Sequence, residues 1–256
     1  MNMLKFPVSL VRTLFGLLWS VFCCSYALLA ILIRPRAANY VLSAIGSRLW
    51  SQNMMRIIGN KTATVTFESE AAAFDNWPAT AIFVANHASQ LDINASAATI
   101  PHPIVYLSKA SIRKVPVLGL LNERVGTVFI DRSNPAAAKR SVDRLLTTLN
   151  RGISVIVYPE GTRTTNGELQ SFKKGAFHLA AKSKTHIIPL HIHGTRRALP
   201  KGGFILRKNP VHVRFGAPIA PPQDDSPRAL QEFVNVGQQA VQRMKDWHKA
   251  QITTPD

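Results

Sequence analysis

An uncharged run of 20 residues, 14–33, constrains this chain more than any other feature of its sequence. As a helix rising about 1.5 Å per residue, the run would be about 30 Å long, which matches the hydrocarbon thickness of a bilayer. Arg12 precedes it, and Arg34 and Arg36 follow it. A cleavable signal peptide fits less well, because the run exceeds the usual apolar region of about 7–15 residues and no clear small-x-small cleavage site follows. We therefore expect a membrane-associated protein.

A second helix, amphipathic this time, is predicted over residues 39–58, and Gly59 ends it. Its apolar residues are Val41, Leu42, Ile45, Leu49, Met54 and Ile57, and its basic residues are Arg48 and Arg56. Positive charge at both ends of the uncharged run leaves its orientation open under the positive-inside rule. A two-helix anchor in one leaflet and a single span both fit this pattern. We expect residues 1–60 to be N-terminal membrane-anchoring helices.

The charge of the chain narrows the class of partner. Lys and Arg number 31 against 14 Asp and Glu, which gives a net charge of +17, and no acid occurs before Glu68 or within residues 169–223. Such fields attract nucleic acid, anionic lipid head groups or phosphorylated substrates. A nucleic-acid-binding protein would explain the charge but not the uncharged run, and aromatic residues are not interleaved with the basic ones. We expect an anionic membrane surface and no nucleic acid.

From residue 61 onward, short apolar strands alternate with helices. Strands are expected over 81–85, 104–107, 125–130, 153–158, 187–192, 204–206 and 211–215, the last two flanking a turn at 208–210. Helices are expected from near Gln90, from Pro135 after an Asn134 cap, around 174–182, and from Ser226 and Pro227 to near the end. This alternation predicts an α/β fold for residues 61–256, in which helices flank a mixed β-sheet.

The segment 86–92, Asn-His-Ala-Ser-Gln-Leu-Asp, directly follows a predicted strand. On one continuous helix His87 and Asp92 would lie about 140° apart, so they can face each other only if the chain turns between them. Ser89 can provide that turn as a helix N-cap, with Asp92 three residues later. The cap alone explains Ser89 and Asp92, and it would leave His87 an ordinary loop histidine. If the side chains meet, Asp92 fixes the tautomer of His87, which can then act as a general base.

Two further segments follow predicted strands, Tyr-Pro-Glu-Gly-Thr-Arg at 158–163 and Gly-Thr-Val-Phe-Ile-Asp-Arg at 126–132. Backbone amides beside Gly161 and the guanidinium of Arg163 could hold an anion such as phosphate. Taken alone, residues 158–163 are better explained by a plain turn with an exposed arginine, and residues 126–132 by a surface ion pair. All three segments, however, lie at the C-terminal ends of predicted strands, where open α/β sheets bind ligands.

Together these segments resemble the conserved blocks of the glycerolipid acyltransferase family. Residues 86–92 are similar to its Asn-His-x-Ser-x-x-Asp box, and residues 126–132, 158–164 and 187–190 are similar to its second, third and fourth blocks. The resemblance covers about residues 80–195, with Tyr158 in place of the common Phe and Thr164 in place of Ser. It is greatest to the bacterial members that make phosphatidic acid.

The resemblance implies transfer of an acyl chain from a thioester, acyl-CoA or acyl carrier protein, to the 2-hydroxyl of 1-acylglycerol-3-phosphate (lysophosphatidic acid). His87 would be the general base, and Asp92 would orient it and stabilise its charged form. Substrate-binding roles are implied for Lys109, Arg132, Glu160, Gly161, Thr162 and Arg163. We expect no cofactor and no metal. The adjacent Cys23 and Cys24 could form neither a disulfide framework nor a zinc site.

Two alternatives stay within lipid chemistry. The acceptor could be another lysolipid, or the protein could be a thioesterase or phospholipase that uses Ser89 as a nucleophile. The chain has no Gly-x-Ser-x-Gly elbow, which favours the transferase. Because the acceptor stays in the leaflet and the thioester donor is cytosolic, we expect the protein in the cell inner membrane with its catalytic domain on the cytoplasmic side.

Overall fold

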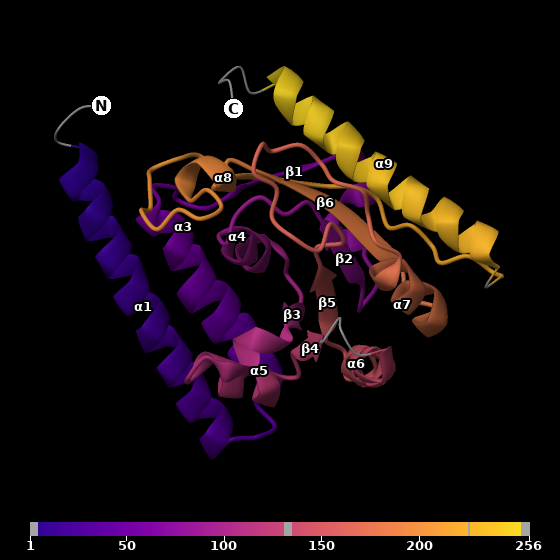
Figure 1. The fold of residues 1–256 in the computed structure, drawn as a ribbon, viewed down its shortest axis with the longest axis horizontal. Helices are drawn as coiled ribbons and strands as arrows, with labels where there is room; N and C mark the ends of the chain where they lie inside the picture. Colours follow the sequence, from indigo (N-terminus) through magenta and orange to yellow (C-terminus); the bar gives the residue numbers. More distant parts are fainter. Residues whose placement is uncertain (1–4, 131–134, 225, 252–256) are drawn as a thin grey trace.

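A computed structural model describes residues 5–130, 135–224 and 226–251, and a seven-stranded sheet forms its centre (Figure 1). The strands are β1 (Thr64–Phe67), β2 (Ile82–Ala85), β3 (Ile104–Lys109), β4 (Val128–Ile130), β5 (Ser154–Val157), β6 (Ile187–His193) and β7 (His212–Phe215). Their order is β1-β7-β6-β2-β5-β3-β4, and neighbouring strands run parallel except β6 and β7, which are antiparallel. The predicted mixed sheet is confirmed.

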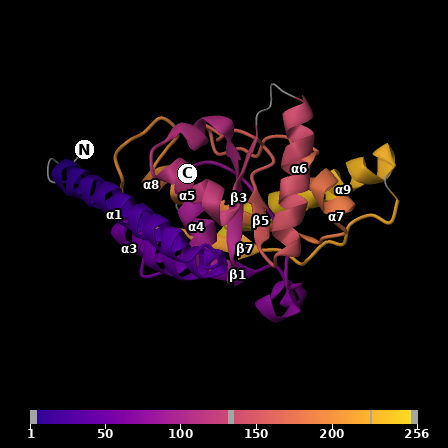
Figure 2. The same cartoon turned by 90° about the horizontal axis from the view of Figure 1, so that it is seen from below.

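Helices cover both faces of the sheet. They are α1 (Lys5–Ile33), α2 (Ala38–Tyr40), the π-helix η1 (Val41–Gln52), α3 (Asn53–Ile57), α4 (Asp92–Thr99), α5 (Leu118–Val125), α6 (Pro135–Asn150), α7 (Gly175–Ser183), α8 (Thr195–Ala198) and α9 (Pro227–Gln251). Three short 3₁₀ turns are η2 (Glu70–Ala72), η3 (Phe74–Asn76) and η4 (Ala110–Lys114). Helices α6, α7 and α9 lie on one side of the sheet, and α1, α3, α4 and α5 lie on the other (Figures 1 and 2).

The central strands are buried on both faces, as strands of a parallel sheet between two helical layers must be. All four residues of β2 are fully buried. Because successive side chains point to opposite faces, Ile82 and Val84 join the core that contains residues of α6, α7 and α9, whereas Phe83 and Ala85 join the core that contains residues of α3 and α4. The tightly packed strands therefore hold their C-terminal ends in fixed positions.

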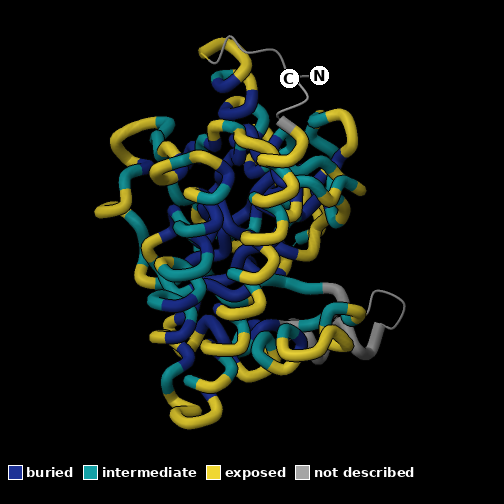
Figure 3. Tube along the Cα trace, turned by 90° about the vertical axis from the view of Figure 1, so that its left-hand side faces the viewer, coloured by how far each residue is buried: buried dark blue, intermediate teal, exposed yellow. Residues whose placement is uncertain are grey.

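Helix α1 contains the uncharged run. Over Phe6–Ile33 it is the one described helix long and apolar enough to cross a membrane, judged by length and composition. One side packs inward, where Ala27 and Ile31 join the core beside η1. The other side exposes apolar side chains such as Leu18 (68%) and Val11 (66%). Figure 3, viewed from the side of α1, shows many exposed stretches of the chain on the side that faces the viewer.

The second predicted helix is present over α2, η1 and α3, but most of it is wound as a π-helix, which the sequence did not indicate. Ile45 is buried in the same core as Ile31, and the Trp50 indole donates a 3.0 Å hydrogen bond to Ser20 Oγ. This segment is thus packed between α1 and the sheet domain. Gly59, with φ of +89°, follows its end as predicted.

The strand predicted over residues 204–206 is wrong. This segment is a loop in which Phe204 is 85% exposed, and the backbone N–H of Arg207 donates to the carbonyl of Ala198 in α8 instead of to a strand. Consequently β7 does not form a hairpin with residues 204–206. It pairs with β6 and β1, and the pairing with β1 was not predicted.

The strand expected over residues 125–130 begins only at Val128, because Val125 ends the unpredicted helix α5. Gly126 then turns the chain with a φ of +96°, a conformation that favours glycine. The predicted Asn134 cap lies outside the described residues. The remaining predicted strands and helices are found within about two residues of their expected positions.

Candidate active site

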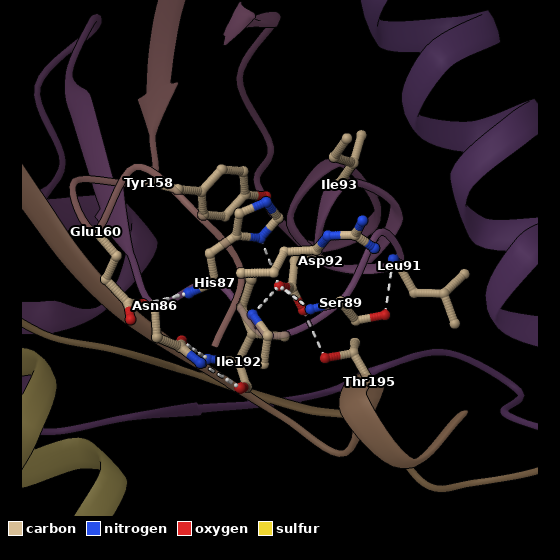
Figure 4. A network of polar contacts seen from close by, with 12 residues as sticks. Asn86, His87, Ser89, Leu91, Asp92, Ile93, Tyr158, Glu160, Ile192 and Thr195 are labelled. Carbon is tan, nitrogen blue, oxygen red and sulfur yellow. Dashed lines mark hydrogen bonds and ion pairs between the residues drawn. The ribbon is translucent and has the colours of Figure 1, made fainter. Parts of the chain in front are cut away.

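Three segments distant in the sequence meet at one edge of the sheet (Figure 4). His87 follows β2, Glu160 follows β5 and Thr195 follows β6. Strands β6, β2 and β5 are adjacent and parallel, so their C-terminal ends open at the same edge. Ligand sites in open α/β sheets lie at this edge.

The side chains of His87 and Asp92 face each other, because the chain turns between β2 and α4. His87 Nδ1 lies 2.9 Å from Asp92 Oδ2. The carboxylate is fully buried, whereas the imidazole is 17% exposed. A carboxylate can only accept, so Nδ1 carries the proton and Nε2 is the nitrogen available for proton transfer.

Three further donors hold the Asp92 carboxylate. Its Oδ2 accepts from the backbone N–H groups of Ala88 at 2.7 Å and Ser89 at 2.9 Å, and its Oδ1 accepts from Thr195 Oγ1 at 2.5 Å. Together with His87, these donors fix the position of the carboxylate. Thr195 was not predicted, since it lies 103 residues away in the sequence and only the β6–β2 pairing brings it here.

The predicted Ser89 cap is present only in part. Asp92 does reach back to the Ser89 N–H, as in a capping box, but α4 begins at Asp92 with Leu91 at the cap position. The Ser89 hydroxyl accepts from Leu91 N at 3.1 Å and donates to the Leu199 carbonyl at 2.7 Å. The hydroxyl of this fully buried serine is thus held by backbone groups. The cap and the histidine contact therefore coexist.

The backbone around His87 is fastened to the neighbouring segments. Asn86 exchanges two hydrogen bonds with the backbone of Ile192 in β6, at 2.9 and 2.7 Å. Glu160 Oε1 accepts from His87 N at 2.6 Å, and Thr164 N donates to the His87 carbonyl at 2.8 Å. Burial raises the pKa of Glu160, whose other oxygen accepts from Gln170 N at 2.9 Å. This carboxyl group therefore holds the site together.

The other predicted site residues differ in their exposure, and not all of them lie within the described part of the chain. Gly161 adopts a φ of +77°, and its N–H donates to the Tyr158 carbonyl at 3.0 Å. Thr162 is exposed, and Arg163 is half-buried, with its carbonyl accepting from Lys201 Nζ at 2.7 Å. Lys109 ends β3, a parallel neighbour of β5, so its backbone lies at the same edge of the sheet. Arg132 lies outside the described residues, as does the Lys109 side chain. No group of three or more His, Cys, Asp or Glu in the described part of the chain could hold a metal ion.

The acyltransferase family model matches residues 65–193, half of the chain. The chain belongs to the acyltransferase family. The matched range contains the His87–Asp92 pair and the segment after β5. The family resemblance recognised in the sequence is therefore confirmed.

Named relatives of this acyltransferase agree on one description. A 1-acyl-sn-glycerol-3-phosphate acyltransferase of Cocos nucifera is 35% identical over 167 residues, covering 65% of this chain and 52% of the relative. One of Limnanthes douglasii is 39% identical over 140 residues, covering 54% and 50%. The chain thus spans about half the length of these curated relatives. This chain is also similar to the crystal structure of the 1-acyl-sn-glycerophosphate acyltransferase PlsC from Thermotoga maritima, with a TM-score of 0.73 and 25% sequence identity. The match covers 93% of this chain and 96% of the Thermotoga chain.

This acyltransferase also carries a hydroxyl network that the sequence did not reveal. The Tyr158 ring stacks on His87 with centroids 4.1 Å apart and planes 14° apart. The Tyr158 hydroxyl lies 3.3 Å from Ser96 Oγ, which lies 3.1 Å from the Tyr106 hydroxyl, which in turn donates to the Ile93 carbonyl. Burial raises the pKa of both phenols, so both are neutral. The only sequence signal was Tyr158 itself, where Phe is usual.

Proposed function

We propose that this acyltransferase moves an acyl chain from a thioester to the 2-hydroxyl of 1-acylglycerol-3-phosphate and so makes phosphatidic acid. The observation that carries the proposal is the 2.9 Å contact of His87 Nδ1 with the buried Asp92 carboxylate. It leaves Nε2 of a partly exposed imidazole available for proton transfer, at the edge of the sheet where open α/β sheets bind ligands. The shared description of the named relatives supports the choice of acceptor.

In the proposed reaction, His87 Nε2 takes the proton of the 2-hydroxyl as its oxygen attacks the thioester carbonyl. A carbon–oxygen bond forms, the carbon–sulfur bond breaks, and the imidazolium returns the proton to the departing thiolate. Asp92 stabilises the imidazolium in the meantime, and the stacked Tyr158 ring adds a cation–π attraction. Proton transfer of this type contributes about 10²–10⁴-fold in rate. The acceptor hydroxyl is itself the nucleophile, so no acyl-enzyme forms.

We assign the acceptor phosphate to the cationic side chains at the same edge. Arg163 and Thr162 follow β5, Lys109 ends β3, and Arg132 follows β4 in the sequence. A guanidinium binds phosphate through two parallel hydrogen bonds. Glu160 and Gly161 serve this site by shaping the loop and holding the His87 backbone.

The N-terminal helices form the proposed membrane anchor, residues 1–60, and residues 61–256 form the catalytic domain. The exposed apolar side of α1 would enter the membrane, and η1 and α3 would lie along it in the same leaflet. Ile31 and Ile45 belong to the same core as the sheet, so the anchor is rigidly attached to the site. A cytosolic thioester donor and an acceptor in the leaflet put the site at the cytoplasmic face of the inner membrane.

The test is acyl transfer by the purified full chain in vesicles that contain 1-acylglycerol-3-phosphate or other lysolipids. Acyl-CoA and acyl carrier protein serve as alternative donors, and the product is identified by mass spectrometry. We expect phosphatidic acid from the parent, a loss of about 10²–10⁴-fold in His87→Ala, and parental activity in the control His178→Ala, an exposed histidine on α7. No transfer to any lysolipid would refute the proposal. An acyl-serine that disappears in Ser89→Ala would favour the hydrolase instead.

A further inference from the structure

The loop between α8 and β7, residues 199–211, carries an unusual surface. Phe204 is 85% exposed, the highest fraction among the large apolar side chains of the described residues. Lys201, Arg207 and Lys208 are exposed on the same loop, and the loop contains no acid. A single exposed apolar side chain is ordinary on a protein surface. An exposed aromatic ring flanked by three cationic side chains is unusual on a protein surface.

One end of the loop is bonded to the active site. The carbonyl of Leu199 accepts the Ser89 hydroxyl at 2.7 Å, directly beside the His87–Asp92 pair. Lys201 Nζ donates to the Arg163 carbonyl at 2.7 Å, in the segment that we assign to the acceptor phosphate. A displacement of this part of the loop would therefore move both sides of the site.

The other end is bonded to the N-terminal helices. Leu206 N donates to Thr13 Oγ1 of α1 at 2.8 Å, and Asn209 N donates to the Ile58 carbonyl after α3 at 3.2 Å. The buried Leu206 packs so closely on Gly16 that a Cβ there would lie 2.9 Å from Leu206 Cδ1. The loop passes between α8 and α3 beside the N-terminal half of α1 (Figures 1 and 2). It thus bridges the anchor and the site.

Cations continue from the loop onto the adjacent helices. Arg12, next to Thr13, donates from Nε to the Ile57 carbonyl at 2.7 Å, and with Arg56 it lines an otherwise mainly apolar groove between α1 and α3. No acid precedes Glu68 in the chain. A band of positive charge therefore borders the exposed apolar side of α1, where anionic head groups would lie if α1 were in the membrane.

We propose that this loop is a second membrane contact, in which Phe204 inserts at the head-group level of an anionic phospholipid bilayer while Lys201, Arg207 and Lys208 bind lipid phosphates. Aromatic side chains favour that depth, and basic residues are attracted to anionic leaflets. The inference rests on the proposed acyl transfer to a lipid acceptor. It adds that seating the loop, which is bonded to Ser89 and to Arg163, holds the active-site edge against the leaflet that contains the acceptor.

Fluorescence quenching tests the insertion without reference to activity. The full chain and its Phe204→Trp variant are reconstituted in vesicles of phosphatidylcholine and phosphatidylglycerol, with or without bromine on the acyl chains. We expect bromine to quench the emission that Phe204→Trp adds to the parent by at least twofold. The control Val236→Trp, at a 41% exposed position on α9, should not be quenched. Equal quenching at both positions, or none at either, would overturn the inference.

Measurements of turnover provide a second test of the membrane role of the loop. Phe204→Ser should raise KM at least fivefold for 1-acylglycerol-3-phosphate in vesicles, with the rate unchanged for a short-chain acceptor dissolved below its critical micelle concentration. Equal loss on both acceptors would overturn the membrane role of the loop. Failure of the proposed function is recognised separately, because the parent itself would then be inactive on both acceptors while the quenching result stands on its own.

Discussion

Replacing Asp92 by Asn changes one atom in the network that orients His87, and the structure allows its effect to be worked out. The amide oxygen can stay on the side of Oδ2, where it still accepts from His87, Ala88 and Ser89. The new NH₂ group then faces Thr195, whose hydroxyl can rotate to accept. The fold and the tautomer of His87 are therefore kept, and what the variant loses is the negative charge.

The lost charge determines how far kcat should fall in Asp92→Asn. An imidazolium and a carboxylate in hydrogen-bond contact have charge centres about 4 Å apart, and at an effective dielectric constant of about 20 their attraction is about 4 kcal/mol. At about 1.4 kcal/mol per factor of ten, kcat should fall about 10³-fold. The free energy of unfolding should fall by no more than about 1–2 kcal/mol, because the three N–H donors keep their acceptor and only the Thr195 hydroxyl loses one.

The assay measures initial rates of phosphatidic acid formation in vesicles, together with circular dichroism and thermal unfolding. Thr195→Val is the matched control, since it removes the 2.5 Å contact but leaves the charge. We expect it to cost less than tenfold in kcat. If folded Asp92→Asn retained kcat within tenfold of the parent, the charge of Asp92 would not be driving proton transfer, and the reasoning would fail.

Three other results are expected. Burial holds the pKa of His191 well below its ordinary 6.5 and that of His248 at about 3, so both stay neutral when folded but bind protons when unfolded. The free energy of unfolding should thus decrease as the pH is lowered below 6.5, by up to about 1.4 kcal/mol per histidine per pH unit. Urea titrations at pH 7 and 5 measure this decrease, and it should be smaller in His248→Gln. Tyr158→Phe keeps the stacked ring and should hold kcat within about threefold, whereas Tyr158→Leu should lower it about tenfold; equal rates would contradict the role of the ring. Rising salt should weaken vesicle binding without full release in flotation assays, because α1 stays inserted; complete release would refute the anchor.

Local patterns in the sequence were enough to predict much of this architecture. The uncharged run became α1 because 20 uncharged, mainly apolar residues without a partner strand can satisfy their backbone hydrogen bonds only as a helix. The continuous apolar runs became the buried strands β2, β5 and β6. The motif after β2 identified His87 and Asp92, since a turn at a strand end is specified by adjacent residues.

Local patterns failed where distant contacts decide the outcome. Residues 204–206 are apolar enough for a strand, yet Leu206 packs on Gly16 and Phe204 is left exposed, because α1 lies where a partner strand would be needed. The π-helical winding of η1 likewise has no sequence signal. Both depend on how the N-terminal helices pack against the rest of the chain.

The sequence alone therefore determined the class of fold, the apolar N-terminal helix and the pair His87 and Asp92, since each depends on residues that are neighbours along the chain. Only the tertiary structure decided that Thr195 bonds Asp92, that Tyr158 stacks on His87, and that Glu160 holds the His87 backbone. These contacts join residues 71 to 103 positions apart. They follow from the strand order β6-β2-β5, which brings the three strand ends together and which no local pattern encodes.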